Sequence, residues 1–427
     1  MLSPRPQEHT GSYYAASANV ATDYPRLLGA QQADVCVIGA GFTGVSTALH
    51  LVERGYSVAV VEANRVGWGA SGRNGGQLIG GFSGEQRVFD SLPEAQRDMV
   101  WGLRWAGHEI VRDRIERYGI ECDFKAGYID VAIKPRHVKD LEEEAALLQS
   151  HAFADEFELL DAHATAELLG TSAYIGGLLN MGNGHLHPLN LCLGEAQAAV
   201  KLGVSVYEQS PVLRIERGKK AVVHTEQGSV EADFVVLAGN AYHFLEKKLR
   251  GALFPVNSFI MATEPLDEEQ VTHINPRDVA VCDPNYILEY YRLSADKRLL
   301  FGGRCNYAGS DSEVIARQLT PRMLKIYPRL RGIQIDYAWG GTIGVTVNRV
   351  PQLGRISDNI LYSQGYSGHG VNVTHLAGQI MADAVAGTLE RFDVFSRIKP
   401  VRLPGMNRFP RQLVALGMLY YKLRDSL

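Results

Sequence analysis

The chain has 427 residues, of which 46% are hydrophobic and 21% are charged, and its formal net charge at neutral pH is -4. This length and composition indicate a globular protein with a large core, divided into two domains or two interleaved lobes. The slightly acidic balance excludes a strongly basic surface, so no nucleic-acid partner is expected.

The N-terminal segment and the cysteine spacing indicate the cellular compartment in which the protein is expected. Residues 1–30 contain prolines and charged side chains but no apolar stretch, which argues against a secretory signal, and we expect them to form an arm on the surface. The five cysteines are scattered without C-x-x-C spacing, so neither a disulfide framework nor a zinc site is indicated. A reducing cytoplasm is the expected compartment.

The first strong pattern follows this arm. The wholly apolar run 35–38 is typical of a central parallel strand buried on both faces. Gly39 permits a tight turn, Gly41 lets the backbone approach a pyrophosphate, and Gly44 lets the next helix pack closely against the strand. We expect that helix to reach Arg54, with its N-terminus facing the phosphates.

A second strand, Ser57–Val61, ends at Glu62, where an acid can accept hydrogen bonds from a ribose and disfavours a 2′-phosphate. Strand, glycines, helix, strand and acid in this order predict a dinucleotide-binding βαβ unit rather than an ordinary glycine-rich turn. Residues 63–77 then form a second glycine-rich stretch, where a simple NAD domain would continue with another βαβ unit.

The middle of the chain mixes helices and strands. The pattern over Glu94–Tyr118 predicts a helix with Trp101, Trp105 and Ile110 on its inner face. Residues 182–188 read as a turn-rich approach to a helix. Their two histidines are expected to cap a helix or line a pocket, because a third metal ligand is missing nearby. Further helices are predicted at 139–149 and 189–202, and strands at 128–133, 204–207 and 233–237, with a hairpin over 212–226 that turns at Gly218.

The segments 254–264, 286–293 and 299–303 are short and apolar or alternating, which predicts an antiparallel sheet in a second lobe. A helix over 310–327 is expected to be interrupted near Pro321. The glycine-rich runs 339–344 and 351–354 precede a strand at 360–363.

A further glycine-rich run, 365–370, opens a helix over 371–386. Two glycine-rich helix starts far apart in sequence suit a ligand anchored at both ends, such as FAD.

These residues resemble the FAD-dependent amine and amino-acid oxidoreductases of the D-amino-acid oxidase type, over nearly the whole chain. The resemblance implies an α/β protein in which a Rossmann-like FAD-binding domain is interleaved with an α+β substrate domain built on an antiparallel sheet. The motifs that carry it are Gly39–Gly44 with Glu62, Gly69–Gly76, Leu186–Pro188, Leu300–Arg304 and Gly365–Gly370. The expected divisions are 31–85, 180–245 and 335–390 for the FAD-binding domain, 86–179 and 246–334 for the substrate domain, 1–30 for the arm and 391–427 for the tail.

More narrowly, Tyr13-Tyr14, the loop 67–77 and the tail 420–425 resemble the polyamine-catabolic branch, the gamma-glutamylputrescine oxidases. This implies oxidative deamination of a small amine, gamma-glutamylputrescine or a related gamma-glutamylated polyamine. Hydride passes to FAD, the imine is hydrolysed to an aldehyde and ammonia, and oxygen reoxidises the cofactor with release of hydrogen peroxide.

The resemblance also assigns residues. His369 is expected to stabilise the reduced flavin, and Arg304 to bind the substrate carboxylate, with a structural backbone role and an ion pair as their alternatives. The residues expected to bind the cofactor are Gly39, Gly41, Phe42, Thr43, Gly44, Glu62, Ala63, Ser71, Arg73, Asn74, Gly75, Gly76, Gln77, Val212, Gly239, Gly341, Gly365, Tyr366, Gly368, His369, Gly370 and Val371.

Two features depart from relatives. Asn348 stands where relatives often carry an acid, which puts any role of that acid in doubt, and no cysteine follows Cys305, so FAD is expected to be noncovalent. The apolar tail 409–427 could lie on a membrane, but packing on the body is the more economical interpretation. The alternatives are a D-amino-acid or N-methyl-amino-acid dehydrogenase of the same fold, a noncatalytic flavin-bearing subunit, and an NAD-dependent dehydrogenase.

Overall fold

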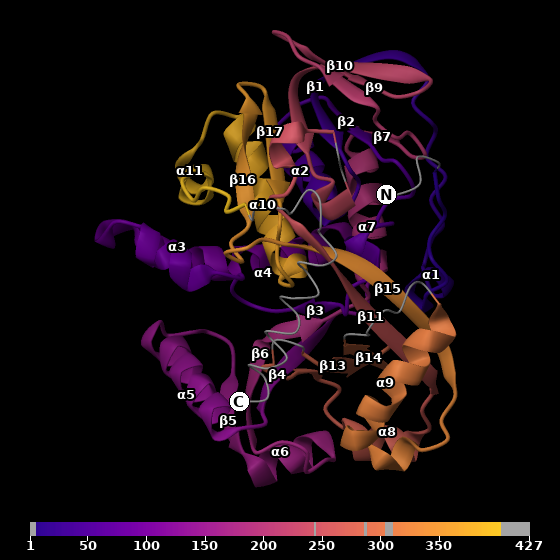
Figure 1. The fold of residues 1–427 in the computed structure, drawn as a ribbon, viewed down its shortest axis with the longest axis vertical. Coiled ribbons are helices and arrows are strands. Elements are labelled where there is room, and N and C mark those ends of the chain that lie inside the picture. The colour runs from indigo at the N-terminus through magenta and orange to yellow at the C-terminus, as the bar shows by residue number, and fades with distance from the viewer. Residues whose placement is uncertain (1–5, 243–244, 286–287, 304–310, 403–427) are drawn as a thin grey trace.

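The computed structural model describes residues 6–242, 245–285, 288–303 and 311–402. Two sheets organise this part of the chain, which we call sheet A and sheet B, with sheet A in the upper half of Figure 1 and sheet B in the lower half. Each sheet is assembled from segments far apart in the sequence. The predicted α/β architecture with interleaved lobes is therefore confirmed.

Sheet A has eight strands in the order β16-β17-β10-β1-β2-β7, with β9 pairing to β10 and β8 to β9. The four pairings from β17 to β7 are parallel, and the remaining ones are antiparallel. The strands are β1 (Gly29–Ile38), β2 (Val58–Val61), β7 (Ser205–Tyr207), β8 (Arg214–Glu216), β9 (Ala221–His224), β10 (Gly228–Leu237), β16 (Gln352–Ser357) and β17 (Ile360–Gln364).

The apolar run of β1 is buried on both faces, as the sequence predicted. Val35 and Val37 belong to one hydrophobic cluster, whereas Cys36 and Ile38 belong to another on the opposite face. The helices that border the first face are α2 (Phe42–Val52), α4 (Asp98–Tyr118), α7 (Pro188–Lys201) and α10 (Gly370–Val385).

Helices α4, α7 and α10 meet at a buried ionic cluster of Arg114, Glu195 and His375. The Arg114 guanidinium donates to Glu195 Oε1 at 2.8 Å, and His375 Nε2 lies 3.2 Å from the same carboxylate. All three side chains are at most 3% exposed. Such a cluster holds the three helices in one arrangement, because losing Arg114 or Glu195 leaves a charge without its partner in the core.

Sheet B has nine strands in the order β15-β11-β14-β13-β12-β4-β6-β3, with β5 pairing to β6. All its pairings are antiparallel except that of β4 with β12. The strands are β3 (Gln77–Leu78), β4 (Lys125–Ala132), β5 (Phe157–Asp161), β6 (Gly176–His185), β11 (Phe254–Pro265), β12 (Ala280–Cys282), β13 (Tyr290–Leu293), β14 (Arg298–Gly303) and β15 (Ile335–Val345).

Helices α5 and α6 lie on one side of the lower half, and α8 and α9 lie on the other (Figure 1). Helices α1, α3 and α11 are short. The bounds are α1 (Tyr13–Ala16), α3 (Glu85–Ser91), α5 (Pro135–Ser150), α6 (Ala162–Leu169), α8 (Glu268–Ile274), α9 (Ser312–Ile326) and α11 (Glu390–Ser396), with single 3₁₀ turns at 70–72, 94–96, 240–242, 247–249 and 328–330.

Several local predictions were wrong. The inner face of α4 carries Val100, Leu103 and Val111, whereas Trp101, Trp105 and Ile110 are half-buried. Helix α9 continues through Pro321 without interruption.

The glycine-rich segments lie largely in strands, so the interpretation of 182–188 as turn-rich was wrong for residues 182–185. Residues 182–185 lie in β6, 339–344 in β15 and 352–354 in β16. Strands β3 and β15 and residues 180–185 of β6 lie in ranges predicted for the FAD-binding domain but pair in sheet B, while the domain boundaries themselves stay a prediction. The residues 286 and 287 of one predicted strand and the tail 409–427 lie outside the described residues. Within the described residues, no helix is both long and apolar enough to cross a membrane.

Candidate cofactor and substrate site

A cavity of about 1710 Å³ is lined by residues of both sheets. At sheet A it is bordered by the ends of β1 and β2 and by the N-termini of α2 and α10. At sheet B it is bordered by residues of β3, β4, β6, β11, β13 and β15. This is the place expected of a ligand in an open parallel sheet, beyond the carboxyl ends of the strands.

The first glycine motif forms a close-packed turn at this cavity. Gly39 has a φ of +107°, which only glycine adopts readily. A Cβ on Gly44 would lie 1.8 Å from the carbonyl oxygen of Gly39, so α2 could not approach the strand with any larger residue. A Cβ on Gly41 would lie 2.8 Å from Ser71 Oγ, and that hydroxyl accepts a hydrogen bond from the Phe42 N–H at 2.9 Å. The start of α2 is therefore open to a ligand only because these positions lack side chains.

The acid at the end of β2 is held by the backbone. Glu62 Oε2 accepts from the Ala40 N–H and Oε1 from the Asn64 N–H, both at 2.8 Å. Burial raises the pKa of Glu62, and these hydrogen bonds oppose the shift. The carboxylate lines the cavity together with Ala63 and Val212, and its remaining lone pairs suit the hydroxyl groups of a ribose.

The loop 69–77 supplies a cation to the cavity. Arg73 stacks over the Trp68 ring at 4.3 Å and donates from Nε to the Trp68 carbonyl at 2.7 Å. It pairs with no carboxylate in the described part of the chain, and burial lowers the pKa of this guanidinium. A half-buried cation without an anion beside it fits a site for a negatively charged ligand. Asn74 fixes the loop by donating to the Ala70 and Ser71 carbonyls and accepting from the Gly76 N–H.

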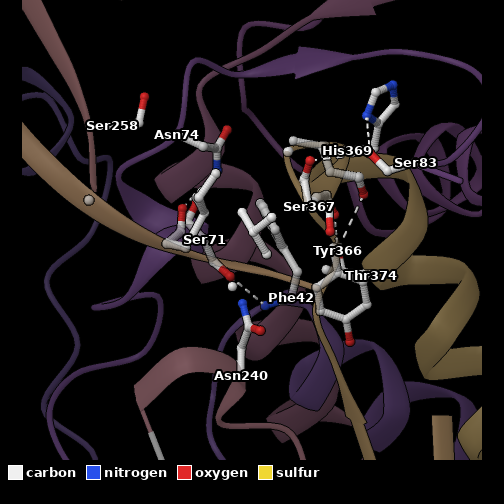
Figure 2. Close-up of a pocket in the computed structure, with 18 of the residues that line it drawn as sticks. Phe42, Ser71, Asn74, Ser83, Asn240, Ser258, Tyr366, Ser367, His369 and Thr374 are labelled. Atoms are coloured by element: carbon white, nitrogen blue, oxygen red, sulfur yellow. Dashed lines mark hydrogen bonds between the residues drawn. The ribbon is translucent and has the colours of Figure 1, made fainter. Parts of the chain in front are cut away.

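The second glycine motif brings the start of α10 to the same cavity (Figure 2). Tyr366 is buried, and its hydroxyl lies 2.7 Å from Thr43 Oγ1 of α2 and 2.8 Å from Ser363 Oγ of β17. His369 Nδ1 lies 3.1 Å from Ser83 Oγ. Burial, and secondly the nearby arginines, lower the pKa of His369 to about 4, so the imidazole is neutral at pH 7.

These observations fit FAD. Two helix N-termini at one cavity, an arginine without a carboxylate among the described residues and an acid suited to a ribose match a dinucleotide. The side-chain amide nitrogen of Gln77, which also lines the cavity, is buried and has no hydrogen-bond partner. A bound polar ligand would satisfy it.

Nearly all predicted cofactor-binding residues line this cavity. Gly44, Gly76 and Gly365 do not. Gly44 and Gly76 stand where a Cβ would strike backbone carbonyls, and Gly365 stands against the Thr346 side chain, so they shape the turns behind the cavity wall. Of the predicted catalytic residues, His369 lines the cavity, whereas Arg304 lies outside the described residues. The binding roles themselves stay predictions.

Sequence reasoning missed the part of the cavity that sheet B supplies. There, Trp105 of α4, Tyr128 and Asp130 of β4, and Glu144 of α5 lie on the lining beside Arg104. Tyr128 donates from its hydroxyl to Asp130 Oδ1 at 2.8 Å, and burial raises the pKa of Asp130 to about 6. The spacing of Tyr128 and Asp130 on one face of a strand was the only signal in the sequence.

The comparisons with known proteins agree with this site. The family model described as FAD dependent oxidoreductase (DAO) matches residues 34–384. The gamma-glutamylputrescine oxidoreductase of Escherichia coli K12 is 43% identical over 423 residues, which cover 98% of this chain and 99% of that protein.

Solved structures share the fold. A glycine oxidase from Geobacillus kaustophilus superposes with a TM-score of 0.69 at 22% identity, covering 85% of this chain and 98% of that one. An L-amino acid deaminase from Proteus vulgaris superposes with a TM-score of 0.70 at 19% identity, covering 95% of this chain and 99% of that one. With the family model spanning most of the chain, this protein belongs to the DAO family of FAD-dependent oxidoreductases, which act on amine and amino-acid donors.

Proposed function

We propose that the protein catalyses the oxidative deamination of gamma-glutamylputrescine or a related gamma-glutamylated polyamine. The observation that carries the proposal is the similarity to the Escherichia coli enzyme, which extends over nearly the full length of both chains. In the overall reaction, the primary amine, oxygen and water give an aldehyde, ammonia and hydrogen peroxide. The amine loses a hydride from carbon and a proton from nitrogen, and water then hydrolyses the imine.

FAD, when bound, accepts the hydride. The chain's own residues bind and orient the reactants. Glu62 and the turn at Gly39–Gly41 would hold the adenosine half, Arg73 would offset the charge of the pyrophosphate, and the start of α10 would hold the other end. Neutral His369 can donate or accept a hydrogen bond at the cavity without adding charge.

Noncovalent FAD is part of the proposal. Cys282 is the one cysteine of the described residues that lines the cavity. Burial raises its pKa well above the usual range, so it stays a protonated thiol and a poor nucleophile.

The acidic part of the cavity supports a substrate that carries more than one ammonium group. Arg104 is already held by Glu85 at 3.0 Å and by Glu144. No cation among the described residues forms an ion pair with Asp130, which lines the cavity beside Trp105, whose indole N–H is buried without a hydrogen-bond partner. A carboxylate next to an aromatic ring is an arrangement that binds ammonium groups.

This part of the cavity lies within reach of the cofactor loop. The Trp105 ring packs against Gly80, which follows Gln77 by three residues and so lies at most about 10 Å along the chain. In gamma-glutamylputrescine, about ten bonds separate the reacting nitrogen from the α-ammonium group, on the order of 12 Å when extended. One substrate molecule can therefore span both places.

The reaction is tested by anaerobic titration of the purified protein with gamma-glutamylputrescine, following the visible absorbance of FAD. We expect bleaching that reverses when air is admitted, with release of hydrogen peroxide. Acid precipitation should leave the yellow colour in the supernatant. Bleaching by D-amino acids or N-methyl amino acids alone would assign the protein to the amino-acid dehydrogenases, and FAD that no donor reduces would indicate a noncatalytic subunit.

Asp130→Asn should raise KM for gamma-glutamylputrescine roughly tenfold or more, because a hydrogen bond to a charged group is lost. The dependence on pH has a definite sign. Since the pKa of Asp130 is about 6, KM of the wild type should rise as the pH falls below that value, and KM of the variant should not follow. Glu143→Gln on the exposed side of α5 is the matched control and should leave KM unchanged. Equal KM values for wild type and Asp130→Asn would contradict this role.

A further inference from the structure

A second arginine, Arg292 of β13, lies directly behind the cofactor loop. Its side chain is buried, with 3% of the residue exposed. Nε donates to the Gly75 carbonyl at 2.8 Å, and Nη2 donates to the Leu186 carbonyl at 2.7 Å. The guanidinium also donates to the Leu293 carbonyl and to the Tyr14 hydroxyl. One cation thus joins the N-terminal arm, the loop 69–77 and the segment before α7.

No carboxylate among the described residues pairs with Arg292. A buried charge is normally paired, because taking it out of water is costly. The contrast with Arg298 on the same hairpin is informative. Each guanidinium lies 5.9 Å from the ring of a tyrosine in α1, but Arg298 is held by Asp296 and Asp336. Arg298 is therefore neutralised, and Arg292 is not.

The uncompensated charge lies close to the cavity. Gly75 lines the cavity, and a single peptide group separates it from the guanidinium that its carbonyl binds. A Cβ on Gly76 would approach Nη2 to 2.9 Å, so the loop can lie this close only as glycine. An arginine cannot lose its proton at physiological pH, so the charge is permanent.

We propose that Arg292 is a positioning residue whose buried positive charge favours the reduced state of FAD. The inference rests on the proposed cofactor site. Transfer of a hydride to bound FAD adds one negative charge to it, and a nearby cation in a low-dielectric interior stabilises that charge. Arg292 makes its hydrogen bonds to the chain and not to the ligand. It therefore acts on FAD through the electric field of its charge and through the position in which it holds Gly75.

The test is the midpoint potential of bound FAD, measured by reduction with dithionite in the presence of reference dyes. Arg292→Met should shift the equilibrium toward oxidised FAD about tenfold or more, which for a two-electron couple is a potential lower by about 30 mV. Arg298→Gln, which removes a neutralised charge from the same hairpin, should leave the potential unchanged. An unchanged potential in Arg292→Met would overturn the proposal.

Arg292→Lys separates charge from shape and serves if the methionine variant does not fold. Lysine keeps the charge but loses the fork of hydrogen bonds, so the potential should stay near the wild-type value at neutral pH. A buried lysine can lose its proton, so the potential should fall more steeply with rising pH than in the wild type. A potential that lies below the wild-type value by the same amount at every pH would refute the role of the charge. Because dithionite replaces the amine, these outcomes are independent of whether gamma-glutamylputrescine is the substrate.

Discussion

Gly41→Val is expected to lower the affinity for FAD by roughly tenfold to hundredfold. The Cβ would lie 2.8 Å from Ser71 Oγ, and the valine methyl groups would occupy the space in front of the first turn of α2. The φ of Gly41 is −86°, so the substitution introduces crowding without backbone strain. Fluorescence titration of the FAD-free protein with FAD measures the effect.

Two variants control for this experiment. Gly102→Val introduces the same side chain on α4 at a position with nothing within 4 Å, and it should leave FAD affinity unchanged. Adding Ser71→Gly to Gly41→Val removes the hydroxyl that the new Cβ would strike. If the double variant recovered full affinity, crowding of Ser71 would be the cause, and the idea that the cofactor approaches the backbone at Gly41 would be wrong.

Glu195→Ala should lower the free energy of unfolding by about 3–5 kcal/mol, because it leaves Arg114 buried without its carboxylate. Urea-induced unfolding at pH 7 with saturating FAD measures the loss. Glu109→Ala, on the exposed face of α4, the helix that carries Arg114, should change the value by about 0.5 kcal/mol or less. A similar small change for Glu195→Ala would show that the cluster contributes little.

The same cluster predicts a dependence on pH. Burial acts to raise the pKa of Glu195, but His375 and Arg114 outweigh it and lower that pKa below its usual 4.5. The stabilisation is therefore present above pH 4.5 and is lost as the pH falls through the lower folded pKa. Glu195→Gln has no carboxyl group at this position, so its free energy of unfolding should fall less than that of the wild type between pH 5 and pH 3. The same urea-induced unfolding, repeated at each pH, measures the difference.

The βαβ unit could be predicted because its signals are local. Strand, glycines, helix and acid follow one another within residues 35–62, and each has a direct physical reason. The cavity lining formed by Trp105, Asp130 and Glu144 could not be predicted, because α4, β4 and α5 bring these residues together only in the tertiary structure. A pattern along one helix marks Trp105 as a core residue and says nothing of a cavity beside it.

Glycines caused the clearest errors. Gly182 and Gly184 were interpreted as turn residues but lie within β6, where the rings of Phe153 and Phe124 leave no room for a Cβ. Gly340 and Gly344 of β15 likewise face Phe259 and Asn240. A glycine that a turn requires and one that a neighbouring ring requires are identical in sequence, so only the packing distinguishes them.

The interleaving of sheet A has a consequence for how the chain acquires its structure. Strand β10 lies between β1 and β17, which pairs Gly29 with Gly228 and Val235 with Ile360. Such contacts join distant residues, so their formation is slow compared with that of local helices and hairpins. During synthesis, residues 235–237 of β10 must wait with one edge unpaired until residue 360 has left the ribosome, although β9 already pairs with residues 229–232, and an open strand edge invites aggregation. Slow production at low temperature should therefore raise the yield of folded protein more than added FAD alone.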